Sequence, residues 1–556
     1  MVAPAAAAVK TFKHHPRPET PHSLLELPRE VLDAVLRALP PRALAALMCT
    51  SRAMCTIAGD TALWARAVRA QGLTVPPRTR EGQSDAHQGA VRADGDALRA
   101  ELCAAARARA NWLCGRYASR ALNGAHTWSV ETLKFVTAKG GERLLVSGAW
   151  DACVAVWQVA DGGCVARLRG HRDWVTSVDA DARVIVSGST DGTVAFWRYD
   201  CLTPVAEFHL GAGVTRVALL DAAASQRTSA VEAKRWPVVA AAASANGQVH
   251  VLGVDPGCAG AADGGASARL AELRAHAQTA WFVQPVLGGG AFLTAGRCGR
   301  LAMWALSSAQ PPADDDDVEY APFARADASA LHDDAVLCLT SIEAEADGGA
   351  ELVASGSADG TTVVYEVRSA GLKQLSRCGV GVPVTAVALG RWPRSRAAVE
   401  GRLELDEASQ VHEGAMVCTG DASGRVLAWR AATGEQVLEV CRHTSPVASL
   451  LFARGGLLAS IAPGDGVLVH ACYAEPDAAD ASAAGRPGAP PVLCLMDGAA
   501  HGWSANGDLA GDCLALGTKE GAVHILSFDH KMQEQGQRAQ DAADAAFQPE
   551  WGGGMW

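Results

Sequence analysis

Residues 170–197 read GHRDWVTSVDADARVIVSGSTDGTVAFW, and the second half of this stretch has the pattern of a β-hairpin. Two short apolar strands flank a Gly/Asp turn, an arrangement typical of tight antiparallel hairpins. The same pattern occurs eight times, as LLVSGAWDACVAVW (144–157), VIVSGSTDGTVAFW (184–197), VAAAASANGQVHVL (239–252), AFLTAGRCGRLAMW (291–304), LVASGSADGTTVVY (352–365), MVCTGDASGRVLAW (416–429), LLASIAPGDGVLVH (457–470) and CLALGTKEGAVHIL (513–526).

The spacing of these copies predicts a ring of β-sheets. The copies end at residues 157, 197, 252, 304, 365, 429, 470 and 526, so the shortest intervals are 40 and 41 residues. A four-stranded propeller blade of roughly 40–45 residues has this length. Longer intervals hold loop insertions, including the acidic run 314–317, which is either a solvated loop or a site for a basic partner. Because one blade cannot bury both of its faces alone, the copies predict a β-propeller.

Counting hairpins predicts eight blades, with seven blades and one inserted copy as the alternative. The eighth copy ends near Phe528 without an obvious outer strand, whereas residues 117–125 precede the first blade without a blade of their own. Closing the ring with the earlier segment would remove an open sheet edge. We therefore expect residues 117–125 to complete the last blade.

Composition limits the classes of function. The chain has 556 residues, a net charge of −11 and 49% hydrophobic residues, which argues against general binding to nucleic acid or anionic membranes. No apolar stretch reaches the roughly 18–20 residues of a membrane helix. The sixteen cysteines form no CxxC pair, so disulfides and zinc are not expected, and the cytoplasm or nucleus is the expected compartment. Residues 1–22 are interpreted as a disordered tail, with a transit peptide as the alternative.

The repeated hairpins resemble WD repeats. In the second copy, a His, a Ser, an Asp and a Trp stand at the positions of that family's hydrogen-bond network, which would satisfy polar groups between strands. The candidate sets are His171, Ser187, Asp191 and Trp197; His126, Ser147, Asp151 and Trp157; and His332, Ser355, Asp359 and Tyr365. Asp191 is expected to accept a hydrogen bond from His171. Recurrence with the blade period favours a structural role over a nucleophilic triad. The other five copies are degenerate.

The N-terminal region is predicted to be helical. Within LELPREVLDAVLRALPPRAL (25–44), apolar residues recur at three- and four-residue spacing between Pro28 and Pro40. Residues 27–64 resemble the F-box, although Cys49 and Thr50 stand where that family commonly has a Val. The resemblance implies docking onto a Skp-type adaptor of a cullin–RING ubiquitin ligase, with apolar contacts from Leu27, Pro28, Val31, Leu32, Leu36, Leu39 and Leu44. A helical hairpin packed on the propeller is the alternative.

The predicted organisation is an all-α F-box, consisting of a three-helix motif plus a helical linker, followed by an all-β WD-repeat propeller. The segments are a disordered tail (1–22), the F-box (23–72), a linker (73–116) with a helix at about 97–115, the propeller (117–528) and a disordered C-terminal tail (529–556). The linker helix acts either as a rigid spacer or as a helix lying on the propeller. Residues 111–117, NWLCGRY, are similar to the junction used by F-box/WD substrate receptors.

The resemblance places substrate on the narrow face of the propeller. The turn positions that would face the channel there are Trp150, Thr190, Ala245, Arg297, Ala358, Ala422 and Lys519, and the inner strands add Thr176, Thr215 and Thr385. Phosphodegron receptors of this family cluster arginines on this face because guanidinium groups pair with phosphate. Here Arg297 and Lys519 are the basic residues, so a phosphate pocket is weakly supported against two surface residues without a special role.

Together these features predict a non-catalytic substrate receptor of an SCF-type ubiquitin ligase, without cofactor or metal. Its expected partners are the adaptor and a protein substrate, either phosphorylated or unmodified; nucleic acid and membranes are not expected. Catalysis would occur by proximity, with a substrate lysine presented to the charged conjugating enzyme. The alternative is a non-degradative WD-repeat scaffold whose F-box-like hairpin serves another assembly. A propeller enzyme would need clustered acids or metal ligands at the channel mouth.

Overall fold

The computed structural model describes residue 111 and residues 117–138, 141–199, 201–220, 236–255, 267–306, 323–343, 351–368, 371–391, 415–453, 457–463, 465–471, 492–496, 503–510 and 513–528. The chain divides into two compact units, Met1–Leu102 and Cys103–Trp556, and the described residues belong to the second. The predicted F-box, almost all of the linker helix and both predicted tails lie outside the described residues. Within the described part, no helix has the length and hydropathy that crossing a membrane requires.

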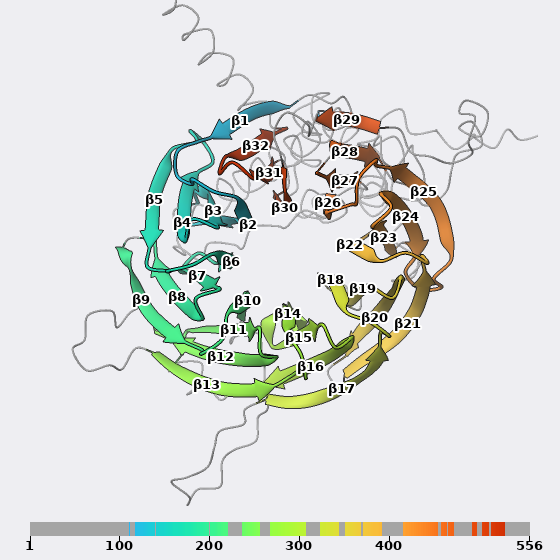
Figure 1. Ribbon diagram of the computed structural model, residues 1–556, viewed down its shortest axis with the longest axis horizontal. Coiled ribbons are helices and arrows are strands. Elements are labelled where there is room, and N and C mark those ends of the chain that lie inside the picture. The colour runs from blue at the N-terminus through green and yellow to red at the C-terminus, as the bar shows by residue number, and fades with distance from the viewer. Residues whose placement is uncertain are drawn as a thin grey trace, which may run out of the picture. The chain divides into compact units, whose positions relative to one another are not determined.

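The second unit is a ring of eight four-stranded antiparallel sheets (Figure 1), which confirms the eight-blade prediction over the seven-blade alternative. Blade 1 contains β2 (Val130–Thr137), β3 (Arg143–Ala149), β4 (Cys153–Gln158) and β5 (Cys164–Arg169), and blade 2 contains β6 (Val175–Ala180), β7 (Val184–Ser189), β8 (Thr193–Arg198) and β9 (Cys201–His209). Blade 3 contains β10 (Val214–Leu220), β11 (Val238–Ser244), β12 (Gln248–Val254) and β13 (Ser267–Arg274), and blade 4 contains β14 (Ala280–Val286), β15 (Ala291–Gly296), β16 (Arg300–Leu306) and β17 (Phe323–Leu331). A 3₁₀ turn, η3 (Leu287–Gly289), follows β14.

Blades 5 to 8 continue the same order. They are formed by β18 (Val336–Ile342), β19 (Leu352–Ser357), β20 (Thr361–Arg368), β21 (Gly371–Gly379); β22 (Val384–Arg391), β23 (Ala415–Asp421), β24 (Arg425–Arg430), β25 (Gln436–Arg442); β26 (Ser449–Ala453), β27 (Leu457–Ala462), β28 (Gly466–Ala471), β29 (Val492–Met496); and β30 (Trp503–Ala510), β31 (Cys513–Thr518), β32 (Val523–Ser527), with β1 (Ala118–Leu122) as the outermost strand. The first strand of each group is innermost, and neighbouring innermost strands contact each other around the ring.

The ring is closed by the first strand of the described chain. Strand β1 pairs antiparallel with β32, with Ala118 opposite Ser527 and Leu122 opposite Val523. The last blade therefore contains strands from both ends of the propeller, as the missing outer strand of the eighth copy predicted. Beyond it, the buried Asn111 side chain donates a hydrogen bond from Nδ2 to the backbone carbonyl of Phe528 at 2.8 Å.

Apolar burial between blades holds the ring together. Every residue of β7 is buried, whereas only two of the six residues of the outer strand β5 are. Eight hydrophobic clusters are present, one at each junction between neighbouring blades, including the junction between blades 8 and 1. Middle strands are thus covered on both faces, which explains why their sequences are continuously apolar instead of alternating.

Candidate functional site

The innermost strands of six blades begin with a β-bulge. The pairing with the second strand shifts register between the first and third residues of β2, β6, β10, β14, β18 and β22. The residue in between is Glu131, Thr176, Thr215, Trp281, Leu337 or Thr385, in chain order. A bulge re-aims the side chain at which it occurs. Six different side chains are therefore set at the same end of the blades.

Three of these bulge residues are the threonines that the sequence placed on the substrate face. Their hydroxyls donate to backbone carbonyls of the following blade: Thr176 to Val214 at 2.7 Å, Thr215 to Ala280, and Thr385 to Val447 at 2.6 Å. These hydrogen bonds join neighbouring blades at the rim of the ring. A role for the three threonines in binding substrate stays a prediction.

The turn positions chosen from the sequence lie at this same end. Six of their backbone N–H groups donate to the carbonyl just before an innermost strand: Trp150 to Ser129, Thr190 to Trp174, Ala245 to Gly213, Arg297 to Thr279, Ala358 to Ala335, and Ala422 to Pro383. The seventh residue, Lys519, is exposed in the turn between β31 and β32. Arg297 and Lys519 belong to blades 4 and 8, which are not neighbours, so the structure does not bring the two basic residues together.

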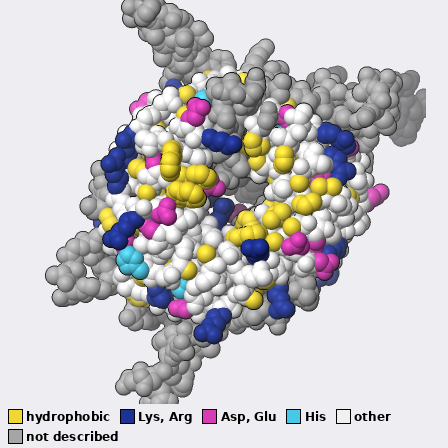
Figure 2. All heavy atoms as spheres, in the orientation of Figure 1, with side chains coloured by type: hydrophobic (Ala, Val, Ile, Leu, Met, Phe, Trp, Pro, Cys, Tyr) yellow, Lys and Arg dark blue, Asp and Glu magenta, His cyan; other side chains and the backbone are white. Residues whose placement is uncertain are grey.

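Three exposed tryptophans lie at this end on blades 1 and 2. Trp128 precedes β2, Trp150 follows β3, and Trp174 directly precedes β6, with exposed fractions of 58%, 37% and 40%. The rings of Trp150 and Trp174 are stacked, with centroids 4.3 Å apart and planes at 9°. Trp150 Nε1 donates to the Glu131 carboxylate at 3.1 Å. Hydrophobic side chains are visible beside the central opening on the side of β2 and β6 (Figure 2).

Sequence reasoning selected Trp150 but missed Trp128, Trp174 and Glu131. The available signal was a large aromatic residue in a polar turn, in AHTWSV (125–130) and GHRDWVTSV (170–178). Single exposed apolar residues are normal on a protein surface, whereas several at one place mark an interaction site. We define these four residues, Trp128, Glu131, Trp150 and Trp174, as the aromatic surface.

Charged groups continue from the aromatic surface along the innermost strands. Lys134 on β2 forms an ion pair with Asp179 on β6 at 3.3 Å, and Asp179 also accepts the backbone N–H of Leu219 at 2.9 Å. Arg216, next to the bulge of β10, is attracted electrostatically to Asp179 and Glu131. Acidic and basic side chains therefore alternate on blades 1 to 3.

The His–Ser–Asp–Trp sets form buried hydrogen-bond networks. In blade 1, Trp157 Nε1 donates to Ser147 Oγ at 2.8 Å, His126 Nε2 lies 2.8 Å from the same oxygen, and His126 Nδ1 lies 3.2 Å from Asp151. The Ser147 oxygen accepts from the indole, and its hydroxyl hydrogen has two acceptors within reach, the imidazole and the Ala155 carbonyl at 3.4 Å, so the indole contact does not fix the tautomer of His126. All of these polar atoms are satisfied inside the blade.

In blade 2 a threonine separates the histidine from the aspartate. His171 Nδ1 lies 2.7 Å from Thr193 Oγ1 but 3.7 Å from Asp191, and the threonine hydroxyl donates to Asp191 at 2.6 Å. The expected direct His171–Asp191 hydrogen bond is thus replaced by a bridge. Burial lowers the pKa of His171. Burial would raise the pKa of Asp191, but hydrogen bonds from the Arg172 N–H and Thr193 hold it below its usual value.

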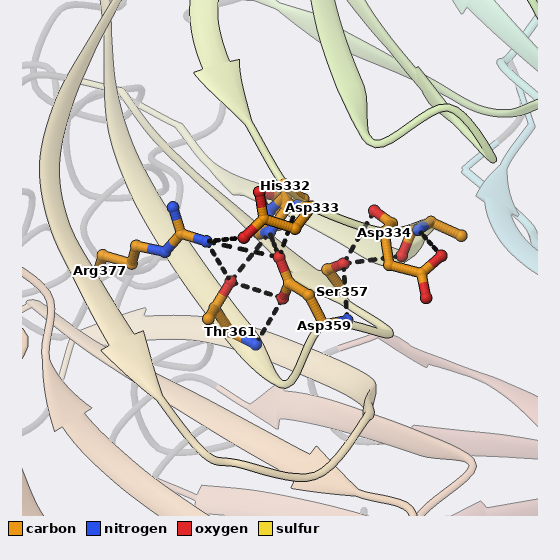
Figure 3. Close-up of polar contacts among 9 residues, drawn as sticks. His332, Asp333, Asp334, Ser357, Asp359, Thr361 and Arg377 are labelled. Carbon is orange, nitrogen blue, oxygen red and sulfur yellow. Dashed lines mark hydrogen bonds and ion pairs between the residues drawn. The ribbon is translucent and has the colours of Figure 1, made fainter.

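The blade 5 network includes a basic side chain from the outer strand (Figure 3). His332 Nε2 lies 2.8 Å from Ser355. His332 Nδ1 lies 3.3 Å from Asp359. Arg377, on β21, reaches Asp359 at 3.4 Å. Tyr365 stands where blades 1 and 2 have Trp, and its buried hydroxyl makes no hydrogen bond to any described residue. Within the described residues, the expected networks therefore differ at two points: the Tyr365 hydroxyl and the direct His171–Asp191 contact.

Blades 4 and 7 lack the full His–Ser–Asp–Trp set but retain parts of the network that comparison with the family pattern missed. In blade 4, Trp304 Nε1 donates to Thr294 at 3.0 Å, while His276 lies 3.0 Å from Thr294 and 3.2 Å from Cys298. Thr and Cys thus occupy the positions of Ser and Asp. In blade 7, His443 lies 2.8 Å from Ser460.

One group of side chains in the described residues has the spacing of metal ligands. His126, Asp151 and Cys153 offer ligand atoms within 4.8 Å of one another. The histidine and the aspartate already satisfy each other in the blade 1 network, and Asp151 also accepts the N–H of Cys153 at 3.1 Å. Burial raises the pKa of Cys153, which disfavours the thiolate that a metal needs. These contacts favour a structural role.

The seven residues predicted to bind the adaptor are Leu27, Pro28, Val31, Leu32, Leu36, Leu39 and Leu44, and all lie outside the described residues. Comparison of the sequence with family models covers this region. An F-box-like model matches residues 24–70, and a model described as WD domain, G-beta repeat matches residues 162–198.

Known proteins resemble parts of the chain. An F-box/WD-40 repeat-containing protein of Arabidopsis thaliana is 25% identical over 178 residues, which cover 32% of this chain and 30% of the relative. Cell division control protein 4 of Candida albicans is 33% identical over 78 residues, 14% of this chain and 11% of the relative. The chain thus spans less than a third of either relative. The crystal structure of Sqt1 from Chaetomium thermophilum shares the fold, with a TM-score of 0.51 and 12% identity over 74% of this chain and 99% of that one.

The eight-bladed ring and its recurring networks define a β-propeller, and the repeat at residues 162–198 matches the WD family model. The F-box-like segment ahead of the propeller specifies the class further. In these two matches the chain resembles F-box/WD-repeat proteins.

Proposed function

We propose that this chain is the substrate-recognition subunit of an SCF-type ubiquitin ligase. The observation that carries the proposal is the F-box-like match at residues 24–70 ahead of an eight-bladed propeller that exposes an aromatic surface. In this arrangement the F-box-like segment binds a Skp-type adaptor in the cytoplasm or nucleus. The propeller binds the protein substrate. A subunit of this kind needs no catalytic residue, because it raises the local concentration of a substrate lysine near the charged conjugating enzyme.

The aromatic surface is the proposed contact site for substrate. Binding energy at protein interfaces concentrates in a few residues, among which Trp is enriched. The stacked rings of Trp150 and Trp174 belong to adjacent blades that are held rigidly by their shared hydrophobic cluster. A partner would therefore meet a preformed surface and would lose little conformational entropy to ordering it.

The test is co-purification of the full chain with a Skp-type adaptor. We expect Leu36→Asp combined with Leu39→Asp to abolish adaptor binding, because each carboxylate would need to be buried in an apolar interface. Trp150→Ala is the matched control, which should retain the adaptor and lose bound substrates. Unchanged adaptor binding by the double variant would refute the receptor role.

A non-degradative scaffold is the second candidate. It is favoured by WD-repeat relatives of other kinds, such as nuclear distribution protein PAC1 of Candida glabrata, which is 39% identical over 70 residues covering 13% of this chain and 15% of that protein. The two candidates differ in the fate of bound proteins. Proteins held by the propeller should become more abundant in cells carrying the Leu36→Asp, Leu39→Asp variant if the chain is a ligase receptor. Their abundance should stay constant if it is a scaffold.

A further inference from the structure

The aromatic surface contains nearly all of the large apolar exposure in the described residues. Among the described residues, four large hydrophobic side chains are exposed: Trp128, Trp150, Trp174 and Val165. Val165 lies on the outer strand β5, whereas the three tryptophans lie at one end of blades 1 and 2, where Trp150 and Trp174 stack on each other. Trp150 donates its N–H to Ser129, which follows Trp128, and Trp174 accepts the N–H of Thr190. The clustering distinguishes a binding surface from scattered exposure.

The geometry of the two stacked rings favours a cation. The two indoles are nearly parallel, with centroids 4.3 Å apart and planes at 9°, and they remain 37% and 40% exposed, so ring surface is left for a partner. A positive charge over the outer face of either ring would be attracted by the ring quadrupole. Trp is the aromatic side chain that binds cations most strongly.

Glu131 adds a carboxylate at the edge of the stack. It occupies the bulge position of β2 and accepts the indole N–H of Trp150 at 3.1 Å. A guanidinium group could lie flat on an indole while its N–H donors reach this carboxylate, since Arg combines a planar stacking surface with a fork of donors. An ammonium group has the charge but lacks the planar stacking surface.

Phosphate recognition is disfavoured at the same place. Turn and bulge positions of blades 1 and 2 hold Trp150, Glu131, Thr190 and Thr176. None is basic, and the Thr176 hydroxyl already donates to a backbone carbonyl. The basic residues of the adjoining inner strands already face carboxylates: Lys134 pairs with Asp179 at 3.3 Å, and Arg216 is attracted to Asp179 and Glu131. A phosphate group would therefore approach the Glu131 carboxylate without a cluster of guanidinium groups to bind it.

We propose that the aromatic surface binds an arginine side chain of a protein partner, with the guanidinium group stacked on the Trp150–Trp174 pair and paired with Glu131. The identity of this partner as a ubiquitination substrate rests on the function proposed above, whereas the binding site does not. Arginine is thereby the recognised element of the substrate segment, in place of a phosphorylated residue.

The test uses the full chain in complex with its adaptor and a display library of random dodecapeptides. We expect the selected peptides to be enriched in Arg, and replacement of that Arg by citrulline, a neutral isostere, to weaken binding about tenfold or more. Synthetic versions carrying phosphoserine or proline in place of Arg should not bind. Selection of peptides without Arg enrichment, or of none, would overturn the proposal.

Variants separate a cation site from a hydrophobic patch. Trp174→Leu keeps an apolar side chain but removes one ring, and Glu131→Gln keeps an acceptor for the Trp150 N–H but removes the charge. Each should weaken peptide binding about tenfold, whereas the exposed control Val165→Ala should leave it unchanged. Unaltered affinity in Trp174→Leu would refute the stacking. If the Leu36→Asp, Leu39→Asp variant still binds the adaptor while Arg peptides still bind the propeller, the ligase role is refuted and the arginine site is retained.

Discussion

The paired substitutions Ser187→Ala and Ser355→Ala test the hydrogen-bond networks quantitatively. Both serines are completely buried. Ser187 Oγ accepts the Trp197 indole N–H at 2.9 Å and lies 2.7 Å from His171 Nε2, so its removal leaves two buried groups without a partner. Ser355 Oγ contacts His332 Nε2 at 2.8 Å, while the Tyr365 hydroxyl meets no hydrogen-bond geometry with any described residue. Ser355→Ala therefore leaves one buried group, the Nε2 atom of His332, without a partner.

The expected losses follow from this count. A buried polar group without a partner costs about 1–3 kcal/mol of stability. We therefore expect the free energy of unfolding to fall by about 3–4 kcal/mol in Ser187→Ala and by about 1–2 kcal/mol in Ser355→Ala. For a cooperative unit of ~400 residues, an unfolding entropy of about 2.1 cal/mol/K per residue makes 1 kcal/mol equal to about 1 °C in Tm. Calorimetry should thus show Tm lowered by about 4 °C and about 2 °C, respectively.

A third variant isolates the indole. In a Trp197→Phe background the indole N–H is already gone, so Ser187→Ala should lower Tm only about half as much as in the parent chain. Equal losses for the two serines in the parent chain would contradict the count of partners. So would a Ser187→Ala effect that is undiminished by Trp197→Phe.

Three further expectations concern a buried histidine, the junction and a turn. Burial lowers the pKa of His470 to about 4, and neither ring nitrogen has a partner in the described residues. As the pH falls, the unfolded chain protonates His470 before the folded chain does, so the free energy of unfolding should decrease between about pH 6.5 and pH 4. Denaturant unfolding should show a loss of about 2 kcal/mol at pH 5, and a smaller loss in His470→Leu. Asn111→Ala leaves the Phe528 carbonyl without its donor, and should lower Tm by about 1–2 °C and speed amide exchange in β32. Gly247→Ala adds a Cβ 2.3 Å from the His276 carbonyl at φ +84°, whereas Gly211→Ala, at φ +77°, meets no atom within 4 Å. The first should lower the free energy of unfolding by at least about 2 kcal/mol more than the second, as thermal unfolding would measure; equal effects would refute the clash.

Local turn chemistry made the blades predictable. Each hairpin has its own Gly/Asp/Asn turn and two apolar strands, so eight copies could be counted without knowing how they pack. Ring closure followed from the same count, because the eighth copy had no outer strand and residues 117–125 had no blade. The acceptor Thr193 was missed, since family matching looks for the aspartate and not for a hydroxyl that bridges to it.

Contacts between blades were not predictable from single repeats. The stacking of Trp150 on Trp174 depends on the spacing of two blades, which no hairpin encodes. The absence of network residues from some blades also has a steric component. A Cβ on Gly170 would lie 2.9 Å from the Trp197 ring, so this position and the indole constrain each other in size. In blade 7 Arg442 precedes the histidine where Gly170 does in blade 2, and the smaller His470 stands at the position of Trp197.

Closure by β1 and β32 has a consequence for the order of synthesis. Strand β1 ends at Leu122 and its partner begins at Val523, so translation at about 5–20 residues per second separates them by roughly 20–80 s. During that interval β1 has an unpaired backbone edge, which is prone to pairing with other chains. A polypeptide that terminates before β32 leaves β1 without a partner and exposes one edge of β31, which still pairs with β30. A late premature stop would thus cost the ring its closure and not merely one strand.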